Sequence, residues 1–486
     1  MKKILFSHSY YYQLDAKQWK TGMPYPPLAT ITAASFMREK GYNVQLFDVG
    51  LRQSPKSIKP ILEEGGFDFL VIYDDGFNYL TKMCLTVMRE ACFEMIDLAK
   101  TSHCKIIISS SDSTDHYQKY LQKGADIVLL GEGEISLLET VQAFQKGIEL
   151  KDIAGICYKK DGDIFKNNKR PVVKNLDEFP LPAWDLIDVD AYKQAWTNKH
   201  HPFALNIATT RGCPYKCNWC AKPIYGNRYN SRSPEMVSKE IEYLAKHFNV
   251  TNFWMCDDIF GLKPNWVNAF NEVLEELNLK ITYKIQSRAD LLLKEDNITA
   301  LAKSGLKEVW IGAESGSQKI LDAMDKGTKI DQIKNATKLL QGQGIRVAFF
   351  IQYGYLGETK EDISKTIQLI KTSNPDDIGI SVSYPLPGTK FYDTVKNELV
   401  NKQNWEDSDD LAMMFKGTFN QNYYRKLHAY THKTFQSSKG FLAVKQFFTK
   451  PITKSRIKLI IKTPFQMLLA SIYKLQLNTM SNKNGE

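Results

Sequence analysis

One stretch decides how the chain is organised: Thr209-Thr210-Arg211-Gly212-Cys213-Pro214-Tyr215-Lys216-Cys217-Asn218-Trp219-Cys220. It spaces three cysteines as C-x3-C-x2-C. It directly follows an apolar run, residues 203–208, that is typical of a strand. Cysteine thiolates are the usual protein ligands of iron–sulfur clusters, which normally take four. Since the next cysteine is Cys256, the spacing predicts a cluster with one iron left open for a small-molecule ligand.

Two other interpretations of these cysteines remain open. A zinc ion completed by His200 or His201 would use the same thiolates, and three reduced thiols near the surface would hold no metal. The spacing favours the cluster, because zinc sites with four protein ligands show different cysteine patterns.

The motif resembles that of the radical S-adenosylmethionine (SAM) enzymes, including the aromatic residue, Trp219, before the last cysteine. The resemblance implies that Cys213, Cys217 and Cys220 hold a [4Fe-4S] cluster whose open iron is chelated by the amino and carboxylate groups of SAM. It also implies reductive cleavage of SAM to a deoxyadenosyl radical, and an electron donor such as a flavodoxin or ferredoxin.

Length and charge restrict the class of protein. A chain of 486 residues is long enough for two or three domains with full cores. Residues 411–485 contain 13 lysines and arginines and no acidic residue, so with Glu486 this segment carries +12. Because the whole chain carries +10, residues 1–410 sum to −2. The positive charge therefore belongs to the tail, and we expect no nucleic-acid partner.

The remaining cysteines indicate the compartment. They are scattered singly along the chain, which is typical of a reducing cytoplasm rather than of a disulfide framework. The apolar run at residues 4–6 is too short for a signal peptide, so we expect a cytoplasmic protein.

Residues 1–145 show β-prone apolar runs alternating with helical patterns, which predicts a doubly wound, five-stranded parallel sheet. Ligands in such folds bind beyond the carboxyl ends of the strands. The candidate binding residues at those ends are Ser7, Asp48, Ser109, Gly131, Glu132 and Gly133.

The order of features in this domain resembles the cobalamin-binding domain that precedes many radical SAM cores. The features are a Pro-Pro-Leu helix start, Gly41-Tyr42-Asn43-Val44 before Asp48, and Gly131-Glu132-Gly133-Glu134 before a helix. The Asp-x-His-x-x-Gly loop of mutases and methionine synthase is missing, because Asp48-Val49-Gly50-Leu51-Arg52-Gln53 contains no histidine. His8, at a strand end, is either a cobalt ligand or a polar loop residue, and a purely structural domain is the alternative.

Residues 146–198 form a connector, in which Asp161-Gly162 predicts a hairpin and a proline-rich linker follows.

Residues 199–400 contain six strand candidates separated by helices, which predicts a partial (β/α)6 barrel with its chemistry at the carboxyl ends of the strands. The resemblance places Asp257 or Asp258, Arg288 and Glu314 on SAM, with Ser287 and Ser315 as polar support. Ordinary ion pairs at the barrel rim are the alternative, and Arg228 and Arg232 either contact a cofactor or cap the loop.

Residues 401–486 are basic and predicted to be mainly helical. Thr463 and Pro464 are typical of a helix start, and an apolar face follows that is too short to span a bilayer. The segment 454–475 either lies on an anionic membrane surface or packs on the barrel.

The resemblance covers about residues 1–430 and implies a cobalamin-dependent radical SAM enzyme, in the leading hypothesis a methyltransferase acting at an unactivated carbon of a small molecule or lipid. A second hypothesis keeps both cofactors for an oxidative ring closure like that of the anaerobic magnesium-protoporphyrin monomethyl ester cyclase. A third, of another class, is a non-catalytic iron–sulfur sensor. No side chain is expected to be a general base, because the cofactors carry the chemistry.

Overall fold

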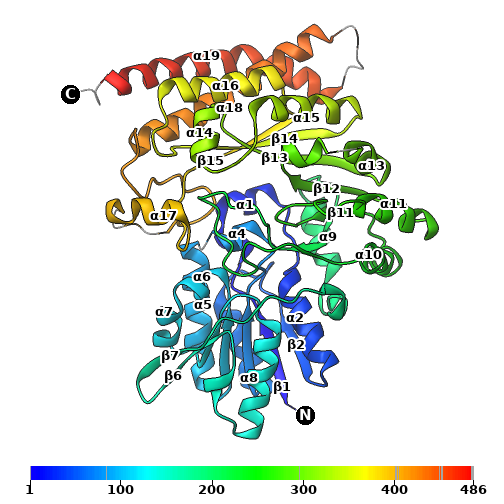
Figure 1. The fold of residues 1–486 in the computed structure, drawn as a ribbon, viewed down its shortest axis with the longest axis vertical. Helices are drawn as coiled ribbons and strands as arrows, with labels where there is room; N and C mark the ends of the chain where they lie inside the picture. Colours follow the sequence, from blue (N-terminus) through cyan, green and yellow to red (C-terminus); the bar gives the residue numbers. More distant parts are fainter. Residues whose placement is uncertain are drawn as a thin grey trace. The chain divides into compact units, whose positions relative to one another are not determined.

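The computed structural model describes residues 2–83, 85–294, 296–399, 402, 404–447, 449 and 453–482. The chain forms two compact units (Figure 1). The first contains Met1–Tyr215, Ala221–Ile285 and Asn404–Asp410, and the second contains Lys216–Cys220, Gln286–Gln403 and Leu411–Glu486. The cysteine loop therefore crosses from the first unit to the second and back.

The first unit begins with a sheet in the order β2-β1-β3-β4-β5-β6-β7. All five predicted parallel strands are present: β1 (Lys3–Ser7), β2 (Asn43–Phe47), β3 (Phe69–Tyr73), β4 (Lys105–Ser109) and β5 (Ile127–Leu129). The predicted connector hairpin forms β6 (Ile156–Lys160) and β7 (Asp163–Lys166) and adds to β5 in antiparallel fashion. The sheet thus has seven strands rather than the five that the sequence predicts for this domain.

Helices cover both faces of this sheet (Figure 1). Helices α2 (Leu28–Glu39) and α8 (Glu134–Lys146) pack on one face, and α5 (Thr86–Ala99) and α7 (Tyr117–Lys123) on the other. All five residues of β3 are buried, as expected for a strand covered on both sides. The core between the sheet and α5 includes Leu70, Ile72, Met95 and Ile96.

The strand order places the switch point of the sheet between β1 and β3, because the chain leaves β1 for β2 on one side and continues through β3 to β5 on the other. In doubly wound folds, ligands bind at the carboxyl ends of the strands around this point. Here those ends carry His8, Asp48 and Asp74-Asp75.

All six predicted strands of the barrel-type core are also present. The first unit holds β8 (Leu205–Ile207), β11 (Asn252–Met255) and most of β12 (Thr282–Ser287), with β11 between β8 and β12. The second unit holds β13 (Leu306–Glu314), β14 (Arg346–Tyr353) and β15 (Asp377–Val382), with β14 in the centre. All these pairings are parallel.

The core helices start at capping signals and present one apolar side to the strands. Helix α10 (Pro234–Phe248) begins where the Ser233 side chain accepts a hydrogen bond from the Met236 backbone N–H, with Pro234 in the first turn. Helix α16 (Lys360–Ser373) begins at a capping box between Thr359 and Asp362. The other core helices include α11 (Trp266–Glu276), α13 (Asn297–Lys303) and α15 (Ile330–Gly342).

The second unit ends in a helical hairpin of α18 (Gln421–Lys445) and α19 (Lys454–Asn482), which lie side by side (Figure 1). Gly440 is required at the crossing, because a Cβ there would collide with the Thr463 side chain. The predicted helix start at Thr463-Pro464 is wrong: α19 begins at Lys454 and Pro464 lies inside it. Thr463 instead packs in the seam and donates to the Leu459 carbonyl (2.8 Å), so tertiary packing overrides the local signal. No helix in the described ranges is long and apolar enough to cross a membrane.

Candidate functional site

Asp48 is the centre of a polar network at the switch point. Its Oδ1 atom lies 2.9 Å from His8 Nε2 and accepts from the Gly50 backbone N–H (2.8 Å), and its Oδ2 atom accepts from the Tyr192 hydroxyl (2.8 Å). Burial acts to raise the pKa of Asp48, but the hydrogen bond and charge of His8, together with the hydrogen bonds from Gly50 and Tyr192, outweigh it and hold that pKa below its usual value. Asp48 thus holds the His8 ring through Nε2, an arrangement that suits a polar loop residue and equally a ligand bound through the other ring nitrogen.

A small cavity borders this network. It is lined by His8 and Gly50, by Asp75 and Thr81 in the segment after β3, and by several tyrosines and prolines. Its volume of about 10 Å³ suits one water molecule. Ser7 does not join this lining, because its hydroxyl donates to the Phe47 carbonyl (2.8 Å) and ties β1 to β2. None of the predicted binding residues lines this cavity, and Asp48 reaches its wall only through the contacts with His8 and Gly50.

The other predicted residues of this domain gather at the ends of β4 and β5. A Cβ on Gly133 would come within 3.1 Å of Ser109 Oγ, so these two positions are adjacent. Glu132 accepts from Arg211 (2.5 Å) and from the Val173 backbone N–H (2.6 Å). Burial raises the pKa of Glu132, against the opposing charge of Arg211. Glu132 thus links the turn of residues 131–133 to Arg211, in the strand that leads into the cysteine loop.

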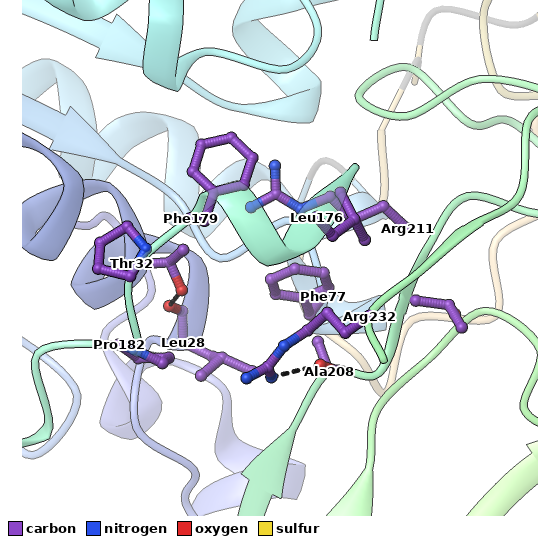
Figure 2. A pocket seen from close by; sticks show the side chains of 11 residues that line it. Leu28, Thr32, Phe77, Leu176, Phe179, Pro182, Ala208, Arg211 and Arg232 are labelled. Carbon is purple, nitrogen blue, oxygen red and sulfur yellow. Dashed lines mark hydrogen bonds between the residues drawn. The ribbon is translucent and has the colours of Figure 1, made fainter. Parts of the chain in front are cut away.

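Arg211 is the buried cation of this contact. It pairs with both Glu132 and Glu134 (2.7 Å), and its guanidinium lies 4.6 Å from the centre of the Phe179 ring (Figure 2). Ion pairs of this kind hold a structure together because removing one partner leaves uncompensated buried charge.

We expect Arg211→Met to lower the free energy of unfolding by about 3–5 kcal/mol, because two buried carboxylates lose their counter-charge. The matched control is Arg38→Met, which breaks a two-pronged but exposed pair with Asp185 and should cost about 1 kcal/mol or less. Urea-induced unfolding followed by circular dichroism measures both. Equal losses for the two variants would contradict a special role for the buried pair.

A second cavity, with a volume of about 30 Å³, is lined by Leu28, Phe77, Phe179, Arg211 and Arg232 among others (Figure 2). Arg232 donates to the Ala208 carbonyl (3.0 Å) and pairs with Glu240 (2.5 Å). Of the two roles that the sequence leaves open for Arg232, the structure therefore favours holding the loop.

Asp257 and Asp258 follow β11 and face different partners. Asp257 is buried and accepts from the backbone N–H groups of Thr209 (2.7 Å) and Thr210 (2.9 Å) and from the Thr209 hydroxyl (2.5 Å). Burial raises the pKa of Asp257 to about 7, although these hydrogen bonds oppose it. Asp258 is partly exposed and pairs with Lys82 (2.5 Å). Asp257 thus fastens the start of the cysteine loop, and Asp258 is the better candidate for a ligand contact.

We expect Asp257→Asn and Asp258→Asn to separate these roles. Asp257→Asn should destabilise the protein by about 1–3 kcal/mol, because an amide nitrogen in place of Oδ2 cannot accept from the Thr209 hydroxyl and a neutral oxygen in place of Oδ1 accepts more weakly from the two backbone N–H groups. Asp258→Asn should leave stability within about 1 kcal/mol and weaken SAM binding about tenfold. Thermal unfolding and calorimetric SAM titration of the reconstituted protein measure the two effects. The reverse pattern would show that Asp257 makes the ligand contact.

Arg288, after β12, points at the cysteine loop within the second unit. Its Nη1 lies 3.8 Å from Cys217 Sγ, Nε donates to Asp290 (2.9 Å), and Nη2 donates to the Lys326 carbonyl (2.7 Å) and the Thr328 hydroxyl (3.2 Å). These contacts fix the guanidinium in one orientation beside a cysteine of the motif.

Glu314, at the end of β13, forms a buried ion pair with Lys326 (2.8 Å). Burial acts to lower the pKa of Lys326, but Glu314 and the nearby Cys217 sulfur outweigh it and raise that pKa. Glu314 has a positive φ of 56°, and the β13–β14 register shifts between Gly312 and Glu314. Such backbone strain in a residue other than glycine is frequent at functional sites.

The two predicted serines differ. Ser315 Oγ lies 3.1 Å from Thr366 Oγ1 and accepts from the Ser317 backbone N–H (3.1 Å), so it supports the turn after β13. Ser287 is buried, and its hydroxyl has no hydrogen-bond partner in the described part of the chain. A buried hydroxyl without a partner is rare in a folded protein and fits the position of a small polar ligand.

The three cysteines are partly exposed and lie on the loop between β9 (Thr210–Arg211) and β10 (Asn230–Ser231). Gly212 opens this loop with a φ of +81°, and a Cβ there would come within 2.5 Å of the Arg228 carbonyl. Across the residues that the structure describes, no three histidine, cysteine, aspartate or glutamate side chains form a ready metal site. Three thiols on one loop, with buried cations beside Cys217, fit an iron–sulfur cluster by donor chemistry.

Sequence reasoning missed Lys326 and Tyr192 in these networks. A lysine in Asp325-Lys326-Gly327 looks like a solvated turn residue, and Tyr192 lies 144 residues from Asp48. No local pattern reveals either contact, because both arise from tertiary packing.

Comparison with known proteins supports the fold and the motif. Residues 207–370 match the Radical SAM superfamily. An uncharacterized methyltransferase of Pyrococcus horikoshii is 31% identical over 282 residues, covering 58% of this chain and 60% of that protein. The anaerobic magnesium-protoporphyrin IX monomethyl ester cyclase of Rubrivivax gelatinosus is 29% identical over 272 residues, covering 55% of this chain and 48% of that protein. The chain thus matches about half to three fifths of the length of these relatives.

The structure of the cobalamin-dependent SAM radical enzyme OxsB with aqua-cobalamin and SAM bound is similar to this chain with a TM-score of 0.73 and 18% identity, covering 98% of this chain and 72% of that chain. At this identity the likeness concerns the fold. Residues 207–370 are therefore a radical SAM domain, and the chain has the fold of the cobalamin-dependent radical SAM enzymes.

Proposed function

We propose that the protein is a cobalamin-dependent radical SAM methyltransferase acting at an unactivated carbon of a small molecule or lipid. The observation that carries the proposal is the position of Arg288, a buried cation whose Nη1 lies 3.8 Å from Cys217 Sγ of the three-cysteine loop and which holds the carbonyl of Lys326, the partner of Glu314. A site for an electron-accepting cluster and an anionic ligand needs fixed positive charge of this kind.

In this proposal Cys213, Cys217 and Cys220 hold the cluster. The charge of Arg288 suits the carboxylate of SAM, with Nη1 as the donor because Nε and Nη2 already pair with Asp290. Asp258 suits the ammonium group of SAM, and the Ser287 hydroxyl supplies a further hydrogen bond. Glu314 contributes through its pair with Lys326, and Ser315 braces the same turn. When bound, the cluster supplies the electron that cleaves SAM, and cobalamin carries the methyl group.

Cobalamin would bind at the carboxyl edge of the first sheet, in residues 1–145. The residues that would hold it are Ser7, Asp48, Ser109 and the turn Gly131-Glu132-Gly133. One observation fits a cofactor with polar edges: a buried Ser111 hydroxyl without a partner among the described residues. Residues 146–198 would then connect this domain to the catalytic core at 199–400, and 401–486 would form the basic, mainly helical C-terminal region.

The second candidate is an oxidative cyclase with the same cofactors, and the similarity to the Rubrivivax cyclase favours it. Methyl transfer is preferred because the methyltransferase relative has the higher identity over a similar span. Either reaction needs a reductant, for which we propose a flavodoxin or ferredoxin in the cytoplasm. A non-catalytic sensor remains the alternative from another class.

Anaerobic purification and reconstitution, followed by metal and cobalamin analysis, tests the proposal. We expect about four iron atoms per chain, about one cobalamin, and an electron paramagnetic resonance signal of the reduced cluster that changes when SAM is added. One zinc ion without iron would support the zinc alternative for the cysteines. Iron without cobalamin would leave a radical SAM enzyme whose first domain is purely structural.

A further inference from the structure

The C-terminal hairpin carries a continuous apolar stripe on one side of α19. Its members are large side chains with exposed fractions of 41–71%: Ile457, Ile461, Phe465, Leu468, Ile472 and Leu475. They are spaced by three or four residues, and at 100° per residue they fall within an arc of about 80°. The stripe is therefore a single face rather than scattered exposed residues.

The opposite side of α19 is already occupied by α18. Thr463 and Leu477 are buried there, Lys426 of α18 donates to Gln476 (2.6 Å), and Arg456 caps the end of α18 through the Ala443 and Gln446 carbonyls. Helix α19 thus packs on α18 with one side and carries the stripe on the side that faces away from α18. A continuous exposed apolar face of this kind marks an interaction surface.

The charges beside the stripe identify its partner. Lys458 and Lys462 lie along one edge of the stripe on a helical wheel, and Lys454 lies at its start. Residues 411–485 contain 13 basic residues and no acidic one. A helix with exposed Phe, Leu and Ile bordered by lysines suits the interface of an anionic bilayer. A second copy of the chain is a poorer partner, because its own hairpin would bring the same positive charge.

We propose that α19 docks on the surface of an anionic lipid bilayer, with the stripe in the outer acyl region and the lysines on the headgroups. The inference goes beyond the proposed reaction and does not depend on it. The protein would lie on the membrane rather than span it, in agreement with the length and hydropathy of the described helices.

Co-sedimentation of the full-length protein with vesicles tests the proposal. We expect binding to phosphatidylcholine vesicles that contain phosphatidylglycerol, and much weaker binding to pure phosphatidylcholine. The double variant Phe465→Glu/Leu468→Glu should reduce binding at least about tenfold. The matched control is Leu339→Glu on α15, an equally exposed leucine of the same unit (53% against 58% for Leu468), which should bind like the wild type.

Charge is tested separately. Lys458→Gln/Lys462→Gln should weaken binding to the anionic vesicles by roughly fivefold per lysine, and added salt should do the same. Helical content from circular dichroism shows that each variant is folded, so that a loss of binding reports on the surface.

Three results would overturn the proposal: no vesicle binding by the wild type, equal binding by Phe465→Glu/Leu468→Glu, or a dimer in sedimentation velocity that the same variant makes monomeric while lipid binding is unchanged. The last result would assign the stripe to a second copy. SAM cleavage is measured in parallel without vesicles, so a failure of the proposed reaction is distinguishable from a failure of membrane docking.

Discussion

Replacing Cys217 with alanine is expected to lower the rate of 5′-deoxyadenosine formation by about a thousandfold or more. Without this thiolate the cluster loses one of three protein ligands, and SAM cleavage depends on the cluster. The effect should be larger than for any single change outside the three cysteines, because every other residue acts on SAM and not on the ligation of the cluster. Iron analysis and chromatographic detection of 5′-deoxyadenosine measure the outcome.

The control is Cys104→Ala, which removes a buried cysteine of the first sheet domain, just before β4. It should keep full iron content and SAM cleavage at some loss of stability. If Cys217→Ala retained the iron of the wild type, the assignment of the cluster to this loop would fail.

Changing Arg288 is expected to have the second largest effect. Arg288→Gln removes the charge and should weaken SAM binding about 30- to 100-fold, since charge-assisted hydrogen bonds to a carboxylate are among the strong ones. Arg288→Lys keeps the charge but loses the fork that Asp290 and the Lys326 carbonyl orient, so we expect about a tenfold loss. Calorimetric titration of SAM into the reconstituted protein measures both.

A structural role alone would give a different pattern. Arg346→Gln breaks an exposed pair with Glu308 and should leave SAM binding unchanged. If Arg288→Gln lowered stability but bound SAM as tightly as the wild type, Arg288 would be a support of the Lys326 turn and not a ligand contact. The shift of the cluster's resonance signal on adding SAM is a second readout that a support role would not affect.

The fold was predictable where local patterns decide it. The strands of the first sheet are short apolar runs between helical patterns, and Asp161-Gly162 predicted the hairpin because both residues adopt positive φ, 52° and 94°. The addition of that hairpin to β5 was not predictable. It depends on pairings such as Val128 with Cys157, which bring an edge strand from another part of the chain.

The site was predictable in its motif and not in its surroundings. Three cysteines at a specific spacing identify the loop by chemistry alone. The alternation of side chains indicates that Asp257 and Asp258 face different sides, but which of them is used internally depends on Thr209 and Thr210. Lys326 is buried by the fold, and Thr463 lies mid-helix because Gly440 packs on it. Neither position carries a local signal of its environment.

The most direct test of the central claim is a product analysis. The anaerobically reconstituted protein, supplied with cobalamin, SAM and a strong reductant, is analysed by liquid chromatography and mass spectrometry. The account predicts both S-adenosylhomocysteine and 5′-deoxyadenosine, because methyl transfer and radical generation each consume SAM. Formation of 5′-deoxyadenosine without S-adenosylhomocysteine would contradict methyl transfer and favour the cyclase. Formation of neither product would contradict a radical SAM enzyme altogether.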